Sequence, residues 1–424
     1  MNSLPGMVRN TFYTPRTTCR ACGRGDLVDL FSLGTQVVSN FVVPGGHEQS
    51  IQCPVDIVLC PACILVQQRH TVSQGFLYRR HYWYTSGTNQ TMRDALAELV
   101  RDVEQRIPLT TGDRVLDVGA NDGTLLRAYR CPGLVRIGVE PADNLATPDN
   151  YQGLVLINDF WPEQAVQAVK DLGKVKVVTA CGMLYDLEDP EAFLQGVAQV
   201  LAPDGLFVAQ LMCLKQTLEQ LDVGNYAHEH LEFYSLWCLE RLLQRCGLQL
   251  VDIAENNTNG GSYRLYIQPQ QDGVYPPSAA RARLAFARAA ESQMRLDRVA
   301  TYQKHYERLD TTRQQCVAFI KQVKAVGHNI WIYGASTKGN VITQWYGLDH
   351  TLITAAADRS PSKWGRYMVG SGIRITSEEE FRQANPPYAL VLPYSFIQEF
   401  IDREAAWRAK GGRFLVPLPE FHIV

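Results

Sequence analysis

Two pairs of cysteines constrain the fold of this chain more than any other feature of its 424 residues. Cys19 and Cys22 form one C-x2-C pair, Cys60 and Cys63 form the other, and 37 residues separate the two pairs. A C-x2-C turn directs both sulfurs toward one point, and two such turns that face each other supply the tetrahedral thiolate shell that structural zinc prefers. We therefore predict a closed structural Zn²⁺ site with these four thiolates as its ligands.

The remaining cysteines do not extend this pattern. The chain has eleven cysteines, and an odd number with seven scattered singly argues against a secreted disulfide framework. Four free buried thiols or a redox dithiol are the alternatives to zinc, although a redox function explains only one pair. Cys53 is a conceivable extra ligand, but no partner lies at ligand spacing, so we interpret it as a buried thiol. The segment around the pairs has little apolar core of its own, and a metal would hold it together.

Length, composition and charge limit the classes of function. Hydrophobic residues make up 46% of the chain, as in ordinary globular proteins, and the length suggests about three domains. The formal net charge is -2, which provides no net attraction to nucleic acid or to an anionic membrane. Residues 1–18 contain no apolar signal region, and no 18 uncharged apolar residues occur in a row. We expect a cytoplasmic monomer or homodimer with a small-molecule substrate, no nucleic-acid partner and no membrane association.

A glycine turn follows a predicted strand at residues 114–118. Gly119 and Gly123 would let the backbone approach a ligand where the next helix begins. A second predicted strand ends at Glu140, 21 residues beyond Gly119, where a carboxylate can accept both hydroxyls of a ribose. The dinucleotide fingerprint G-x-G-x-x-G is absent, and the turn reads D-x-G-x-x-x-G from Asp117. This form resembles motif I of the class I S-adenosylmethionine (SAM)-dependent methyltransferases.

The following segments continue the alternation of strands and helices for more than 100 residues, which predicts a doubly wound sheet. Further strands are predicted at 175–180 and 206–209, with a helix at 191–201 between them. The segment 156–160 resembles the part of these methyltransferases that holds the adenine of the cofactor. Other Rossmann-like proteins would share parts of this pattern. The resemblance implies SAM as the cofactor and the following binding residues: Asp117, Gly119, Asn121, Gly123, Glu140, Asp159 and Phe160.

A histidine-rich segment, His228-Glu229-His230, follows this predicted sheet. The unperturbed pKa of histidine lies nearest neutrality, so an imidazole can take a carbon-bound or hydroxyl proton at pH 7, and a carboxylate can fix its tautomer. The spacing is not that of H-E-x-x-H, which argues against a catalytic zinc here. Two surface histidines before a helix are the alternative. The position just beyond a cofactor-binding sheet favours the catalytic interpretation.

Together these motifs resemble the zinc-containing sugar C-methyltransferase family, whose members act on nucleotide-linked 4-keto-6-deoxyhexoses. The resemblance covers nearly the whole chain and includes a G-G-S-x-R strand at 260–264 and a second glycine turn at 334–339. It implies that a proton is removed from the carbon next to a keto group before the methyl group is transferred. His230 would be the base, Glu229 its assisting carboxylate and His228 a neighbour.

Two departures from the family pattern concern this chemistry. The family has tyrosine immediately before H-E-H, whereas this chain has Ala227 there and Tyr226 one residue earlier. In an extended segment a shift of one residue turns a side chain to the opposite face. Tyr226 stays a catalytic candidate, while Tyr185 could supply a phenol from another wall. The changes suggest a divergent branch, so the alternatives are O-methylation, methylation of a small non-sugar metabolite, and a non-catalytic protein that binds SAM or a sugar nucleotide.

The C-terminal part begins with a proline- and glycine-poor stretch to residue 326, which predicts one or two long helices. A strand at 329–333 then leads into the second glycine turn, where Lys338 could hold a diphosphate. The alternative is that this C-terminal unit binds no ligand and only forms a wall of the substrate cleft. The segment 70–92 is expected to cover that cleft. The candidate substrate contacts are Tyr84, Tyr185, Arg264 and Lys338.

The predicted fold class is α/β. We expect a small N-terminal zinc-binding module at residues 1–90 and a central class I methyltransferase domain with a Rossmann-like sheet at 91–268. A helical linker and a C-terminal Rossmann-like domain would occupy 269–424.

Overall fold

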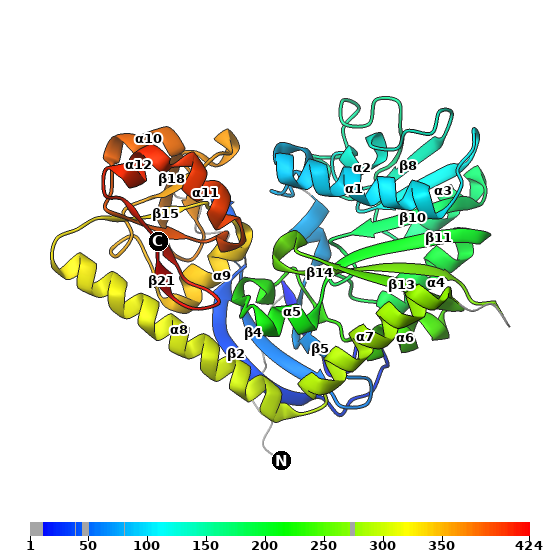
Figure 1. The fold of residues 1–424 in the computed structure, drawn as a ribbon, viewed down its shortest axis with the longest axis horizontal. Coiled ribbons are helices and arrows are strands. Elements are labelled where there is room, and N and C mark those ends of the chain that lie inside the picture. The colour runs from blue at the N-terminus through cyan, green and yellow to red at the C-terminus, as the bar shows by residue number, and fades with distance from the viewer. Residues whose placement is uncertain (1–11, 39, 45–50, 80, 272–275) are drawn as a thin grey trace, which may run out of the picture.

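The chain folds into two α/β lobes with a β-rich N-terminal module between them, as Figure 1 shows for the computed structural model. The structure describes residues 12–38, 40–44, 51–79, 81–271 and 276–424. The expectation of no signal region concerns residues 1–18, and residues 1–11 of that stretch lie outside the described residues. Among the helices described, none has the length and apolar character needed to cross a bilayer.

The N-terminal module consists of two small sheets. Strands β1 (Tyr13–Pro15) and β6 (His70–Val72) form one, while β2 (Val28–Val37), β4 (Gln52–Cys60) and β5 (Leu65–Gln68) belong to the other. The second sheet is completed by β12 (Glu232–Phe233), which follows the histidine-rich segment and pairs antiparallel with β5. A further N-terminal strand, β3 (Phe41–Val42), pairs with the C-terminal lobe through β17 (Tyr367–Met368). The module thus contributes to both lobes through backbone pairing.

The central lobe contains a seven-stranded sheet in the order β13-β14-β11-β10-β7-β8-β9. The strands are β7 (Arg114–Val118), β8 (Val135–Val139), β9 (Val155–Ile157), β10 (Val175–Cys181), β11 (Leu201–Met212), β13 (Leu248–Asn256) and β14 (Ser262–Pro269). The first five are parallel, and β14 runs antiparallel to β11. The helices are α1 (Gln90–Arg106), α2 (Thr124–Arg127), α3 (Glu163–Leu172), α4 (Pro190–Val200), α5 (Leu214–Glu219) and α6 (Leu236–Arg245).

This arrangement confirms the predicted α/β class and the class I methyltransferase topology of the central unit. Strand β7 is buried along almost its whole length, as expected when helices cover both faces of a parallel sheet. The predicted strand at 114–118 has these bounds in the structure as β7. The second predicted strand, which leads to Glu140, is β8, and the predicted helix at 191–201 is α4. Strand β11 is longer than the predicted 206–209: its end pairs with the antiparallel strand β14 as far as Met212, and its start at Leu201 pairs with Val175 of β10.

The C-terminal lobe begins with two helices, α7 (Ser278–Met294) and α8 (Val299–Ala325), in agreement with the predicted helical linker. Its eight-stranded sheet has the order β21-β20-β19-β15-β16-β18-β17-β3. The remaining strands are β15 (Ile330–Tyr333), β16 (Ala356–Asp358), β18 (Ile373–Ser377), β19 (Tyr388–Val391), β20 (Arg413–Val416) and β21 (His422–Ile423). The helices are α9 (Thr337–Tyr346), α10 (Glu378–Ala384), α11 (Ile397–Arg403) and α12 (Ala405–Ala409). Short single turns elsewhere in the chain occur at 75–79, 86–88, 223–226, 258–260, 361–363 and 394–396.

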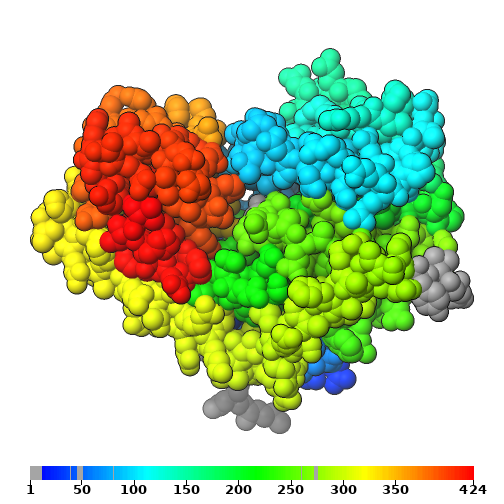
Figure 2. All heavy atoms as spheres, viewed as in Figure 1, coloured from blue at the N-terminus to red at the C-terminus, as the bar shows by residue number. Residues whose placement is uncertain are grey.

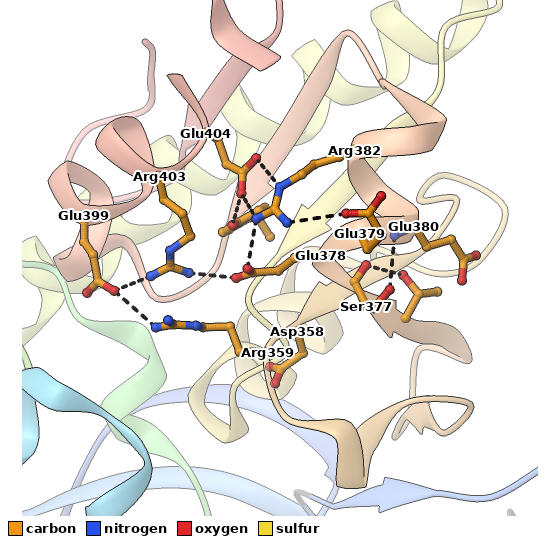
Figure 3. A network of polar contacts seen from close by, with 12 residues as sticks. Asp358, Arg359, Ser377, Glu378, Glu379, Glu380, Arg382, Glu399, Arg403 and Glu404 are labelled. Atoms are coloured by element: carbon orange, nitrogen blue, oxygen red, sulfur yellow. Dashed lines mark hydrogen bonds and ion pairs between the residues drawn. The ribbon is translucent and has the colours of Figure 1, made fainter. Parts of the chain in front are cut away.

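An ion-pair network joins the helices that cover one part of the C-terminal sheet (Figure 3). Arg382 contacts the buried carboxylate of Glu404 at 2.6 Å, and the hydroxyl of Tyr333 donates to the same carboxylate at 2.6 Å. Arg403 contacts Glu378 at 2.7 Å. Because Glu404 is only 2% exposed, the arginine and the tyrosine stabilise a carboxylate that burial would otherwise penalise. The network therefore ties α10 and the segment between α11 and α12 to β15.

Candidate active site

The four predicted cysteine ligands converge at the start of β5. All four Sγ atoms lie within 4.8 Å of one another, and the Cys19–Cys63 and Cys22–Cys60 Sγ pairs are each 3.5 Å apart. Four thiolates bound tetrahedrally to zinc at about 2.3 Å would stand about 3.8 Å apart. All four cysteines are free of disulfides, so the arrangement fits a structural Zn²⁺ ion, as the spacing predicted.

Two other cysteines clarify the surroundings of this centre. The Sγ of Cys238, at the start of α6, lies 4.0 Å from the Sγ of Cys63, a proximity that no C-x2-C spacing could have indicated. Cys53 lies in β4 outside the four-sulfur group, and burial raises the pKa of its thiol to about 12. The structure therefore agrees with the interpretation of Cys53 as a buried thiol.

Arg20, inside the first C-x2-C turn, links the zinc centre to the histidine-rich segment. Its buried guanidinium donates to the carbonyl oxygen of Gln68 at 2.6 Å and to the hydroxyl of Thr71 at 2.6 Å. Its Nε lies 3.8 Å from the carboxylate of Glu232, two residues after His230. The zinc-binding turn and the loop that carries the predicted base are therefore parts of one packed unit.

A cavity of about 550 Å³ lies between the two lobes, and Figure 2 shows the lobes separated by a hollow on the viewed face. Most of the predicted site residues line it: Asp117, Gly119, Asn121, Glu140, Asp159, Phe160, Tyr84, Tyr185, His230 and Lys338. The other predicted residues lie outside its lining: Gly123, Tyr226, His228, Glu229 and Arg264. The fold thus brings the cofactor motif, one histidine and the C-terminal lysine to a common space.

Two carboxylates mark the cofactor end of the cavity. Asp117 ends near the carboxyl edge of β7, where the Thr179 hydroxyl donates to it at 2.6 Å and burial raises its pKa to about 7. Glu140 follows β8 and accepts the backbone N–H groups of Asn121 and Ala142, each at 2.8 Å. Burial raises the pKa of Glu140 to about 7. Each oxygen of the Glu140 carboxylate keeps a second lone pair, so it can still accept ribose hydroxyls.

The glycine turn between these carboxylates needs its glycines for different reasons. Gly119 lines the cavity with φ +74°, and a Cβ there would lie 3.2 Å from the Cγ of Met183. Gly123 also has φ +74°, but it lies behind the turn, where a Cβ would meet the Cδ1 of Leu154 at 2.9 Å. Residues that carry a side chain rarely adopt a backbone conformation with positive φ. Gly119 therefore leaves room for a ligand, while Gly123 lets the chain turn into α2.

The predicted adenine segment lies at the cavity as well. Asp159 and Phe160 both line it, together with Trp161, which the sequence had not singled out. The backbone N–H of Phe160 donates to the Asp159 carboxylate at 2.8 Å. The side-chain amide of Asn158 donates to the carbonyl oxygen of Glu140 at 3.0 Å, which holds this segment beside the ribose position. The carboxylate, the two aromatic rings and the glycine turn together fit the groups of SAM.

The predicted cover segment is held directly on the glycine turn. The side chain of Asn121 accepts the backbone N–H of Ser86 at 2.9 Å and donates to the carbonyl oxygen of Tyr84 at 3.0 Å. Asn144 makes the same reciprocal pair with the backbone of Tyr82, at 2.8 and 3.0 Å. Tyr84 lines the cavity, so this segment closes the side of the cavity above the cofactor motif.

His230 is held in one tautomer beside the cavity. Its Nδ1 lies 2.8 Å from the carbonyl oxygen of Asn225. A carbonyl oxygen can only accept, so Nδ1 carries the proton, and in the neutral ring Nε2 then has a free lone pair. Burial lowers the pKa of His230 to about 4, and the positive charge of Lys338 acts in the same direction. The ring of Tyr185 meets the imidazole edge-on with centroids 4.8 Å apart.

The other predicted catalytic side chains point elsewhere. His228 is buried and its Nε2 lies 2.9 Å from the carbonyl oxygen of Cys53. Tyr226 ends the single turn at 223–226 and is not in an extended segment, and its hydroxyl lies 3.0 Å from Nε2 of His305 on α8. Glu229 is adjacent to the cavity wall without lining it, and burial raises the pKa of its carboxyl to about 7. Of the H-E-H segment, His230 alone reaches the cavity.

Asp186 is a cavity residue that the sequence had not identified as functional. It follows Tyr185, is 9% exposed, and its Oδ1 has no hydrogen-bond partner among the described residues. Burial holds the pKa of this carboxyl well above its usual range, and the nearby carboxylates of Glu229 and Glu232 add to the effect. A carboxylate in a turn carries no sequence signal of its own. Other unpredicted residues that line the cavity are Tyr78, Tyr82, Asp222 and Tyr394.

Arg264 is not found where a substrate contact was predicted. Its guanidinium lies 2.6 Å from the carboxylate of Glu98 on α1, and its Nε donates to the side chain of Gln210 at 3.0 Å. The side chain is buried between α1 and the sheet. Successive residues of a strand face opposite sides of the sheet, and in β14 this position faces the helix rather than the cavity lining.

Lys338 reaches from the C-terminal lobe to the central lobe. Its Nζ lies 3.2 Å from the carboxylate of Asp222 and also binds the side-chain oxygen of Asn225. It therefore lines the cavity, as predicted, but its charge is already matched by an aspartate of the other lobe. Ser336 caps α9 by accepting the backbone N–H of Gly339 at 3.0 Å, which gives the lysine a defined position in the first turn of the helix.

Comparisons with known proteins agree with this organisation. Three family models match in succession: a domain described as zinc binding at residues 19–78, a methyltransferase domain at 87–253, and the C-methyltransferase C-terminal domain at 257–419. The C-methyltransferase NovU of Streptomyces niveus is 30% identical over 413 residues, 97% of each chain. A ubiquinone biosynthesis O-methyltransferase of Caulobacter sp. (strain K31) is 30% identical over 32% of this chain and 54% of its own length.

Among solved structures, magnesium protoporphyrin IX methyltransferase from Synechocystis PCC 6803 with bound SAH is 14% identical. The match covers 43% of this chain and 89% of that chain, with a TM-score of 0.33.

The doubly wound central sheet, the glycine turn and the methyltransferase model that matches them define a SAM-dependent methyltransferase. The similarity to NovU extends over the zinc-binding module and the C-terminal unit as well. The chain therefore belongs to the C-methyltransferase family, which confirms the resemblance found from its motifs.

Proposed function

We propose that this protein methylates the carbon next to the keto group of a nucleotide-linked deoxyketosugar, with Nε2 of His230 as the general base. The observation that carries the proposal is the hydrogen bond from Nδ1 of His230 to the Asn225 carbonyl oxygen at 2.8 Å. It reserves Nε2 as an acceptor at the cavity, and burial keeps the ring neutral at pH 7. A base must be unprotonated before it can remove a proton.

The chain's own residues support each part of the chemistry. His230 would take the proton from carbon, and the electron pair of the broken C–H bond would become an enolate. Tyr185 lies against the imidazole, and burial holds the pKa of its phenol well above the usual range. The phenol thus keeps its proton and can donate to the enolate oxygen, which stabilises the developing charge. Asp186 follows Tyr185, burial holds the pKa of its carboxyl well above the usual range, and in its protonated form it would be a second donor.

The cofactor would be held by Glu140 at the ribose, by Phe160 at the adenine and by the turn at Gly119. When bound, SAM supplies an electrophilic methyl group to the carbon nucleophile. The residues of the cavity hold the two reactants in line, which is the main demand of methyl transfer. The cover segment around Tyr84 would exclude water from the nucleophile.

The shape of the cavity supports a second, larger reactant. Beyond the cofactor motif the cavity continues along the C-terminal lobe, with apolar walls from Leu392, Phe396 and Leu418. A sugar placed at His230 would leave its nucleotide between the lobes. The similarity to NovU, a C-methyltransferase, supports transfer to carbon rather than to oxygen.

The proposal is tested with a panel of nucleotide-linked 4-keto-6-deoxyhexoses and SAM labelled with ¹³C in the methyl group. We expect one sugar to gain a labelled methyl that NMR identifies as C–CH₃. An O–CH₃ signal would establish the O-methylation alternative. If no sugar of the panel gains the label but a non-sugar metabolite does, the proposed sugar substrate is contradicted.

Proton removal can be measured separately from methyl transfer. In D₂O without SAM, the accepted sugar should exchange the hydrogen next to its keto group for deuterium. His230→Asn should stop this exchange, whereas His328→Asn, at an exposed position of the C-terminal lobe, should leave it at the parent rate. Exchange that persists in His230→Asn would show that another group is the base.

A further inference from the structure

A cation of the C-terminal lobe is bound to the residues that precede the H-E-H segment. Lys338 contacts the carboxylate of Asp222 at 3.2 Å and the side-chain oxygen of Asn225. Gly224, between them, permits this approach because a Cβ there would lie 2.9 Å from the Cβ of Lys338. The lysine therefore reaches this turn at a place where the backbone carries no side chain.

Asn225 connects this cation to the base. Its side-chain oxygen faces Lys338, its side-chain N–H donates to the hydroxyl of Thr217 at 2.9 Å, and its carbonyl oxygen accepts Nδ1–H of His230 at 2.8 Å. The side chain is thus bound on both sides, which restricts the rotation of the peptide group whose carbonyl holds the imidazole. Asn225 is 3% exposed, so water has little access to compete for these bonds.

We propose that Lys338 is a positioning residue for His230: through Asn225 it holds the carbonyl oxygen that keeps the proton on Nδ1 and leaves Nε2 free. The proposal rests on the function proposed for His230. It also means that the C-terminal lobe takes part in preparing the base, so that the site is complete only when the two lobes are joined.

A second contact from the same lobe strengthens the connection. The hydroxyl of Tyr394 donates to Oδ1 of Asp222 at 2.7 Å, while Lys338 contacts Oδ2. One carboxylate of the central lobe is therefore bound on both oxygens by the C-terminal lobe. Because Asp222 receives both contacts, Lys338 keeps its position without depending on Asn225 alone.

The charges around the imidazole agree with this placement. Lys338 lowers the pKa of His230, and Asp222 raises it. Tyr185 contacts the ring, and Glu229 is the preceding residue. Loss of Lys338 would remove the effect that lowers the pKa of the imidazole and leave the opposing effect of Asp222, so this pKa should rise. The acid limb of kcat/KM, which reports the protonation of the base, should then move to higher pH.

The proposal is tested with Lys338→Met in the full-length, zinc-loaded protein. Long-range ¹H–¹⁵N NMR of the histidine rings reports the tautomer without any substrate. We expect the parent to show His230 as the Nδ1–H form, and Lys338→Met to show a mixture with the Nε2–H form. In kinetics kcat should fall about tenfold or more, with a change in KM of less than about threefold.

Matched variants separate this effect from loss of folding. Lys363→Met removes another lysine of the same lobe, which pairs with Asp358 at 3.2 Å, and should change neither the tautomer nor the pH profile. Asp222→Asn with Lys338→Met removes both charges of the ion pair, so it avoids a buried unpaired carboxylate and should still show the mixed tautomer.

The main competing role is direct binding of a substrate diphosphate by Lys338. In that case Lys338→Met would raise KM, while the tautomer would stay as in the parent, and our proposal would be overturned. The NMR result does not depend on which substrate is methylated. A failed proposal for the sugar substrate would therefore be distinguishable from a failed proposal for Lys338.

Discussion

Gln68 joins the zinc-binding module to the loop that carries His230, and its replacement should loosen that loop. The side-chain N–H groups of this buried glutamine donate to the carbonyl oxygens of Tyr226 at 3.1 Å and Ala227 at 3.0 Å. Its backbone N–H also donates to the carbonyl oxygen of Leu231 at 2.9 Å. Gln68→Leu keeps a similar volume and removes only the two side-chain hydrogen bonds.

The expected magnitude follows from the partners that remain. The carbonyl oxygen of Ala227 keeps the N–H of His230 at 3.0 Å, so the loss there is one hydrogen bond, about 1 kcal/mol. The carbonyl oxygen of Tyr226 loses this donor, which costs about 1–3 kcal/mol for a buried acceptor. Oε1 of Gln68 has no partner among the described residues. Removal of this unsatisfied buried oxygen should therefore stabilise the closed loop by about 1 kcal/mol. The free energy of local opening should fall by about 1–3 kcal/mol, which raises the open population about 5-fold to 150-fold.

Hydrogen exchange followed by mass spectrometry measures this opening in peptides that cover residues 224–233. We expect faster exchange of these amides in Gln68→Leu and a lower kcat, because the carbonyl that orients His230 lies in the same loop. Gln36→Leu is the matched control: Gln36 is 3% exposed, and neither polar atom of its side chain has a partner in the described structure. This control should leave exchange unchanged. Parental exchange in Gln68→Leu, or equal acceleration in both variants, would refute the reasoning.

Three further predictions concern the base, the metal and the cofactor. His230→Asn should abolish turnover while calorimetry still detects SAM binding, because the imidazole lies apart from the glycine turn; retained turnover would exclude His230 as the base. Metal analysis should find about one zinc per chain, and Cys63→Ser should lower both the zinc content and the melting temperature; a folded, metal-free parent protein would contradict the four-thiolate site. Burial raises the pKa of Glu140 to about 7, and the ionised carboxylate is the form that accepts two ribose hydroxyls. SAM affinity should therefore be full above pH 7 and decline as the pH falls below it, and Glu140→Gln should bind more weakly with a flatter pH dependence. A slope that Glu140→Gln leaves unchanged would assign the pH dependence to another group.

The parts of the site that depend on local spacing could be predicted from the sequence. A C-x2-C turn orients its own two sulfurs, so the four cysteines form one site once the two turns face each other. Gly119 and Glu140 follow two neighbouring parallel strands, whose carboxyl ends lie at the same edge of a sheet. Short-range geometry therefore determined the zinc ligands, the cofactor motif and the α/β class.

The direction of the remaining side chains was decided by contacts between residues far apart in the chain. The spacing of H-E-H by itself could not show which of its residues reaches the cavity, because that depends on the pairing of β12 with β5 of the zinc-binding module. Arg264 is bound by Glu98, and Lys338 is bound by Asp222 of the other lobe. Spacing along the chain carries no information about such partners, since each is chosen only when separate elements pack together. The sequence by itself determined the chemical groups of this methyltransferase, and the tertiary structure decided which of them face the same cavity.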